Sequence, residues 1–381
     1  MTNRRSFLKL LSTGVIGSTV SSTLLLTQGC SHKKLLNPDE DIILSGGSYE
    51  DDDRKQPALI LINPLQKEKK LIPTDFLPHG IITDPNNKYR ILCFEKNGSR
   101  ACEIDLLKRT VTQVFNSENN QQFSGHGVFS FDGKQLYTIE MDTNNQQGNI
   151  AIRNAKTFEL IKQLPTLGLT PHDCQLLKDN TLVVSNTGQD KSKFHQPSLV
   201  YINLKTEKLI QRKKLDDDSL NCGHFEINQN NDLVIASAPV DKKTIIGGIS
   251  IETAGQAMTT MKEPIEVIQR MQGEALGISI NDAHHVIAVT HPQGNLLSFW
   301  SLKNKKIIKA IGIENPRGIE QTLDKRNFIV SYGNSPAMAN ITINNLVPQA
   351  DSIVQPTHTS GEHILNWSRN LREIMPTNVY D

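Results

Sequence analysis

The chain is poor in aromatic residues and cysteine, and its charges nearly cancel. Of its 381 residues, 5% are Phe, Trp or Tyr and five are cysteines, and the formal net charge is +1. A near-neutral chain lacks the basic excess typical of nucleic-acid-binding proteins, so we expect no nucleic-acid partner. The sequence also has no Gly-x-Ser-x-Gly elbow, phosphate loop, dinucleotide fingerprint or zinc-finger spacing, so no motif announces a known reaction.

The main feature of the sequence is a series of short apolar runs. Runs rich in valine and isoleucine alternate with turns rich in Gly, Asn and Asp, a pattern typical of all-β proteins with many hairpins. The length suffices for two ordinary domains or one large repeat domain. Within an insertion over 258–271, the spacing of Ile265, Ile268 and Met271 predicts a short helix.

A histidine recurs at a nearly fixed spacing. It stands in Pro78-His79-Gly80, Gly125-His126-Gly127, Pro171-His172-Asp173 and Gly223-His224-Phe225. The steps are 126 − 79 = 47, 172 − 126 = 46 and 224 − 172 = 52 residues. Each histidine opens a unit of short apolar strands and polar turns, and a period of about 40–50 residues is typical of four-stranded propeller blades.

Two further units carry the same strand pattern without the histidine. Their Gly-Ile pairs align Leu276 and Arg317 with the histidines, at steps of 276 − 224 = 52 and 317 − 276 = 41 residues. The six units leave three strands over 42–77 without an inner strand, which the C-terminal segment 364–367 can supply. We therefore predict an all-β fold over 42–381, a seven-bladed β-propeller closed by N- and C-terminal strands, with six or eight blades as alternatives.

The N-terminus predicts export. The run Asn3-Arg4-Arg5-Ser6-Phe7-Leu8-Lys9 is close to the twin-arginine pattern, and a mildly apolar stretch follows. We interpret 1–29 as a Tat-type signal peptide, 30–41 as a linker and the protein as periplasmic, with a Sec signal or an uncleaved anchor as alternatives. Gly29-Cys30 ends the apolar stretch as in a lipoprotein processing site, although the usual upstream Leu is missing. Lipidation at Cys30 therefore stays open, and a lipid anchor would be the only expected contact with a membrane.

Several of these motifs together resemble a known family. They are the twin-arginine start, His79-Gly80-Ile81, the run from Gly125 to Lys134, Pro171-His172-Asp173 and the run from Pro197 to Tyr201. This pattern is similar to a family of exported bacterial propellers of unknown function, related to YVTN-type propellers and often found near imelysin-like iron-uptake proteins. The resemblance covers most of 42–380. It implies the propeller fold, an envelope location and iron-uptake proteins of the cell envelope as partners.

The repeated histidines admit two interpretations. Inner strands line the central channel of a propeller, so His79, His126, His172 and His224 are expected to form an arc at one channel mouth. Neutral imidazoles are ligands for transition metals, so the arc could hold an ion such as copper or iron, with Arg317 placed to bind an anion. Alternatively, each histidine bonds the backbone of a neighbouring blade and holds the ring together.

The cysteines allow a similar choice. Counting outward from a two-residue turn at Asn97-Gly98, Cys93 faces Cys102 at a non-hydrogen-bonded position, so the pair forms either a disulfide or two buried thiols. Cys174 and Cys222 lie close in sequence to two of the histidines, and they either pair, join the histidines as ligands or pack in the core.

Three functions remain as hypotheses. The first is an exported propeller that binds a transition metal or a small ligand at the histidine arc, in a metal-uptake context. The second is a non-catalytic protein-interaction scaffold with structural histidines. The third is a lactonase-like hydrolase, since related propellers act on small esters with residues at the channel mouth.

Overall fold

The computed structural model describes residues 35–188, 196–240 and 244–375. Contacts divide the chain into two units, 1–36 and 37–381, and the fold below is that of the second unit. The predicted signal peptide over 1–29 and the predicted lipidation site at Cys30 lie outside the described residues. Within the described ranges, no helix combines the length and the apolarity needed to cross a membrane.

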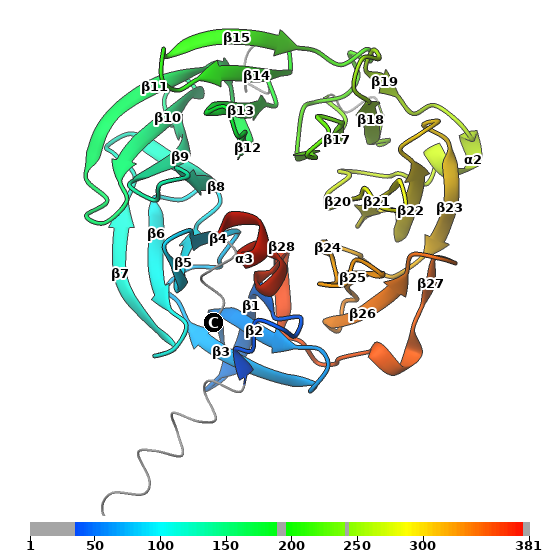
Figure 1. Ribbon diagram of the computed structural model, residues 1–381, viewed down its shortest axis with the longest axis horizontal. Coiled ribbons are helices and arrows are strands. Elements are labelled where there is room, and N and C mark those ends of the chain that lie inside the picture. Colours follow the sequence, from blue (N-terminus) through cyan, green and yellow to red (C-terminus); the bar gives the residue numbers. More distant parts are fainter. Residues whose placement is uncertain (1–34, 189–195, 241–243, 376–381) are drawn as a thin grey trace, which may run out of the picture. The chain divides into compact units, whose positions relative to one another are not determined.

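Seven antiparallel sheets of four strands each surround a central channel, as predicted (Figure 1). The blade that joins both chain ends contains β28 (Thr359–Asn366), β1 (Ile43–Asp51), β2 (Arg54–Asn63) and β3 (Glu68–Pro73). The next blade contains β4 (Gly80–Asp84), β5 (Asn87–Phe94), β6 (Arg100–Asp105) and β7 (Thr110–Asn116). The third contains β8 (Gln121–Phe129), β9 (Gln135–Asp142), β10 (Gln147–Asn154) and β11 (Leu160–Leu169). The fourth contains β12 (Pro171–Leu176), β13 (Thr181–Asn186), β14 (Ser198–Asn203) and β15 (Lys208–Lys213). The fifth blade contains β16 (Phe225–Ile227), β17 (Leu233–Ser237), β18 (Gly248–Glu252) and β19 (Thr259–Thr260). The sixth contains β20 (Ile278–Asn281), β21 (Val286–His291), β22 (Leu296–Ser301) and β23 (Ile307–Gly312). The seventh contains β24 (Ile319–Gln321), β25 (Asn327–Tyr332), β26 (Ala337–Thr342) and β27 (Val347–Pro348).

The C-terminal strand closes the ring. β28 pairs antiparallel with β1, with Ile364 opposite Ser45 and Asn366 opposite Ile43. The predicted closure by both chain ends is thus confirmed, because the blade that joins them takes its inner strand from the C-terminus and its other three strands from the N-terminus. The strand ends earlier than expected, because the Asn366 side chain accepts a hydrogen bond from the Arg369 amide and starts helix α3 (Trp367–Ile374).

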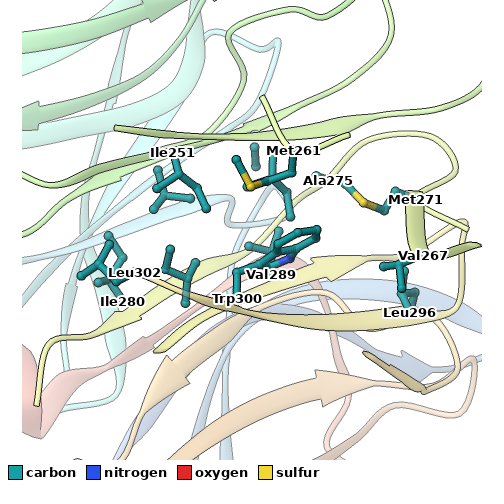
Figure 2. Close-up of a cluster of buried hydrophobic side chains, with 14 residues drawn as sticks. Ile251, Met261, Val267, Met271, Ala275, Ile280, Val289, Leu296, Trp300 and Leu302 are labelled. Atoms are coloured by element: carbon teal, nitrogen blue, oxygen red, sulfur yellow. The ribbon is translucent and has the colours of Figure 1, made fainter. Parts of the chain in front are cut away.

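Apolar side chains between neighbouring blades form the core. All residues of β13 and β17 are buried, whereas five of the six residues of the outer strand β15 are exposed. Middle strands are therefore apolar on both faces, which explains their continuous apolar runs. Figure 2 shows one such layer, where Met261 and Ile251 of one blade meet Trp300 and Val289 of the next.

The predicted short helix is also confirmed. The insertion over 258–271 contains a single helical turn, α2 (Ile265–Ile268), and a 3-10 helix, η1 (Ala350–Ser352), follows β27. Asn180 closes the turn after β12 with a φ of 64°, a conformation that Asn tolerates better than most residues.

Side-chain amides link neighbouring inner strands. Gln175 of β12 donates to the Ile227 carbonyl at 2.7 Å and accepts from the Ile227 amide at 2.9 Å. In the same way, Gln321 of β24 donates to the Ile280 carbonyl at 2.9 Å and accepts from Asn281 at 2.8 Å. These bonds hold blades together near the channel without using a histidine.

Substitution of Trp367 tests how much the closure of the ring contributes to stability. The fully buried indole of Trp367 donates to the Lys88 carbonyl at 2.7 Å and stacks on Tyr89, with ring centroids 6.0 Å apart. We expect Trp367→Ala to lower the free energy of unfolding by about 3–5 kcal/mol, because it leaves a cavity where the chain ends meet. Trp367→Phe should lose less, since it keeps most of the apolar surface.

Denaturant unfolding measures these differences. Leu65→Ala is the control: Leu65 is 77% exposed, so its loss should change the free energy by no more than about 0.5 kcal/mol. Equal midpoints for Trp367→Ala and the control would show that the C-terminal segment does not stabilise the ring.

Candidate metal centre

Five histidines meet in the channel, on five consecutive blades. His79 and His224 directly precede β4 and β16, and the other three lie within β8, β12 and β28. The five are His79, His126, His172, His224 and His363. Neighbouring rings have centroids 4.2 to 6.2 Å apart. The predicted arc of four histidines therefore exists, and the closing strand adds a fifth.

Bulges and glycines bring these side chains together. The strand register shifts between Phe123 and Gly127, around His126, and comparable shifts surround His172 and His363. A bulge turns the strand and redirects a side chain, which is common next to functional sites. A Cβ on Gly80 would lie 2.1 Å from the Gly125 carbonyl oxygen, so only glycine allows these inner strands to approach so closely.

Two carboxylates lie behind the rings. The Asp173 side chain lies 3.3 Å from Nδ1 of His126 and 3.3 Å from Nδ1 of His224. A Glu362 oxygen lies 3.4 Å from Nδ1 of His79. A carboxylate that accepts the Nδ1 proton fixes the tautomer and leaves Nε2 with its lone pair, as is usual for metal-binding histidines.

The Nε2 atoms converge in front. Those of His79 and His126 lie 3.1 Å apart, and those of His172 and His224 lie 2.9 Å apart. Two nitrogens each about 2.0–2.1 Å from one ion lie roughly 2.9 Å apart at a right angle and about 3.3 Å apart at the tetrahedral angle. The observed spacings match a shared ion. Ring nitrogens of His79, His126, His224 and His363 all lie within 4.8 Å of one another.

His363 adds an independent observation. Its Nε2 is buried and has no hydrogen-bond partner in the structure. An unpaired buried polar atom costs about 1–3 kcal/mol, so native proteins rarely leave one without a ligand or a function. Here the unpaired nitrogen belongs to the same group of four rings that a metal ion would join.

Burial keeps the rings neutral. It lowers the pKa of His126, and it lowers the pKa values of His79, His172, His224 and His363 to well below the usual histidine range. Mutual repulsion among the imidazolium forms adds to this effect for all but His126. Neutral imidazole is the form that binds transition metals.

Cavities lie on both sides of the histidines. The channel cavity, about 850 Å³, is lined by His126, His224 and His363 and reaches Arg369 and Glu373 of α3. The second, which we call the rim cavity, measures about 460 Å³ and is lined by Glu274, Leu276, Pro292, Gln293, Asn295, Asn315, Arg317, Asn334 and Glu362. The histidines therefore lie near one end of the channel, as the propeller geometry predicted.

Arg317 occupies the rim cavity, but its partners belong to the protein. Its guanidinium donates to the Gly361 carbonyl at 3.3 Å and lies 3.6 Å from Glu362, which also pairs with Lys96. Leu276 and Arg317 do align with the histidines, since their amides bond Thr290 and Ser331 as the His79 amide bonds Phe94. Anion binding at Arg317 stays a prediction.

His363 was not among the residues predicted from sequence. It stands 363 − 317 = 46 residues after Arg317, a step equal to that between His126 and His172. Extending the repeat by one period would have found it. No glycine flanks it, however, because Glu362 and Ile364 are its neighbours.

The four cysteines in the described part of the chain lie outside the two groups of possible metal ligands. Cys93 and Cys102 lie directly opposite each other on β5 and β6 as free, buried thiols. The predicted turn differs: Glu95 and Arg100 share a backbone hydrogen bond, so Cys93 and Cys102 occupy a hydrogen-bonded position. The turn widens because Gly98 pairs with Phe123 of the next blade. Cys174 and Cys222 pack in different apolar clusters.

The chain belongs to a protein family. That family, described as "Protein of unknown function (DUF1513)", matches residues 73–360, about three quarters of the chain. No curated protein matches the chain. The relation to YVTN-type propellers and to iron uptake stays a prediction.

Two solved structures share the propeller fold. The hydrazine synthase of Kuenenia stuttgartiensis superposes with a TM-score of 0.61 at 9% identity, over 75% of this chain and 89% of that one. The dihydro-heme d1 dehydrogenase NirN in complex with DHE superposes with a TM-score of 0.58 at 11% identity, over 88% of this chain and 76% of that one. At such identities the similarity concerns the fold alone.

The disulfide can be tested by counting thiols. In protein recovered from an oxidising compartment, we expect Cys93 and Cys102 to be bonded, since they lie face to face on paired strands. Alkylation under denaturing conditions should label two fewer thiols before reduction than after it. The same number in both samples would refute the disulfide, and Cys93→Ser should abolish any difference.

Proposed function

We propose that this protein is an exported propeller of the cell envelope that holds one transition-metal ion, copper or iron. The ligands are His79, His126, His224 and His363. One observation carries the proposal: ring nitrogens of four buried or partly buried histidines lie within 4.8 Å of one another, and carboxylates hold three of the rings from behind.

The donor set favours a transition metal. Calcium and magnesium bind oxygen ligands, whereas neutral imidazoles suit copper, iron, zinc and nickel. Asp173 and Glu362 lie on the Nδ1 side of the rings, so they orient the ligands and partly neutralise the charge of the ion.

The stapling interpretation is less well supported. The ring nitrogens of His79, His126, His172 and His224 contact other histidines and carboxylates. The stapling interpretation expected bonds to the backbone of a neighbouring blade, and side chains such as Gln175 and Gln321 supply those. The scaffold and lactonase hypotheses have no observation in their favour comparable to the unpaired nitrogen of His363.

The envelope context rests on sequence. The twin-arginine pattern at Arg4-Arg5 favours the Tat route, which exports folded proteins and so allows a metal to be inserted in the cytoplasm. The resemblance to propellers found near imelysin-like proteins favours iron-uptake proteins of the envelope as partners. Lipidation at Cys30 would keep the protein at the membrane surface.

Metal content tests the proposal. Protein folded in the cytoplasm should contain one ion per chain by elemental analysis. His79→Ala combined with His126→Ala should lose it, because two of four ligands are gone. His284→Ala, which removes an exposed histidine in a turn, is the control and should keep the metal. Equal metal content in the double variant and the control would refute the site.

Asp173 gives a finer test. Asp173→Asn keeps the size of the side chain but removes the charge facing His126 and His224. We expect metal affinity to fall by about 10–100-fold, measured by competition with a chromogenic chelator. Asp51→Asn, an exposed residue of β1, should leave the affinity unchanged. An unchanged affinity for Asp173→Asn would show that the carboxylate does not support the ligands.

A further inference from the structure

Glu274 joins the rim cavity to the histidines. Its side chain is 36% exposed and lines the rim cavity, while its Oε1 lies 3.9 Å from Nε2 of His172. The other rim carboxylate, Glu362, is already engaged by His79, Lys96 and Arg317. Glu274 is therefore the carboxylate that a hydrated cation in the rim cavity can approach while the histidines remain in reach.

A second group of possible ligands forms around it. Ligand atoms of His172, His224 and Glu274 all lie within 4.8 Å of one another. This outer group has one oxygen and two nitrogen donors, and it shares His224 with the inner group of four histidines. Its oxygen donor faces the rim cavity, whereas the inner group consists of imidazoles alone.

The shared histidine allows only one position to be filled. Nδ1 of His224 faces Asp173 at 3.3 Å, so Nε2, which lies 2.9 Å from Nε2 of His172, is the nitrogen left for a metal. One lone pair binds one ion. An ion in the outer group must therefore leave it for the inner group to be complete, and it can do so without releasing His224.

We infer that His172, His224 and Glu274 form a loading position for the metal centre, an inference that rests on the proposed function. A hydrated divalent transition-metal ion exchanges water first for the Glu274 carboxylate and then for the imidazoles of His172 and His224. His79, His126 and His363 then replace Glu274 and His172 while His224 stays bound. The first steps replace water by protein ligands, the last replaces Glu274, His172 and remaining water by three imidazoles, and none changes the oxidation state of the ion.

Loading kinetics with Co²⁺ test this route, because the d–d absorption of Co²⁺ reports its ligands. Metal-free full-length protein is mixed with Co²⁺ in a stopped-flow instrument, and release is followed after addition of excess chelator. For Glu274→Gln we expect loading and release to slow together, by roughly tenfold or more, with equilibrium affinity and final spectrum unchanged. His172→Ala should slow both rates in the same way. Glu314→Gln, an exposed residue outside the outer group, is the control and should match the wild type.

Other outcomes separate the alternatives. A lower affinity for Glu274→Gln with an unchanged loading rate would make Glu274 a ligand of the resident ion and overturn the loading role. Unchanged rates in both Glu274→Gln and His172→Ala would also overturn it. A wild-type protein that takes up no Co²⁺, Cu²⁺ or Fe²⁺ would refute the proposed function itself, and the loading position with it.

Discussion

Pairing between β28 and β1 is the interaction on which both the fold and the histidine cluster depend. The strand that closes the ring also carries Glu362 and His363. Glu362 holds His79 from behind and binds Lys96 and Arg317, so it links residues far apart in sequence. His363 supplies one of four converging nitrogens. An open ring would lose an apolar interface, one histidine of the cluster and the carboxylate behind another, so the cluster is complete only in the closed propeller.

The sequence predicts much of this because repetition carries information over long distances. The histidine period determined the blade count and brought His79, His126, His172 and His224 together before any contact was known. His363 was not predicted, because it lies in a bulge of β28 and has no flanking glycine to mark it. The roles of Asp173, Glu274 and Glu362 depend on rotamers and on contacts across the channel, which no spacing in the chain reveals. The period of the sequence thus predicts the histidine arc, whereas the carboxylates around it become known only from the packing of the folded chain.

The histidine cluster is an unfavourable way to fill a propeller channel. Burial removes the rings from water, and the Nε2 atoms of His79 and His126 lie only 3.1 Å apart. Aliphatic side chains of the same volume would need no hydrogen bonds and would leave no atom like Nε2 of His363 unpaired. A protein that keeps such an arrangement departs from the rule for stable cores, and departures of this kind concentrate at functional sites. A bound cation would give the converging ring nitrogens a common partner.

The histidine repeat is interrupted at two blades, and this interruption bears on access to the cluster. Five consecutive blades present histidines, whereas the remaining two present Leu276 and Arg317 beside the rim cavity. A ring of seven histidines would close around an ion from every side. With five, one side stays open, and there Glu274, two residues before Leu276 and ahead of β20, lies 3.9 Å from His172. The same substitution that removes a ligand from the arc therefore leaves a path to it, bordered by a carboxylate.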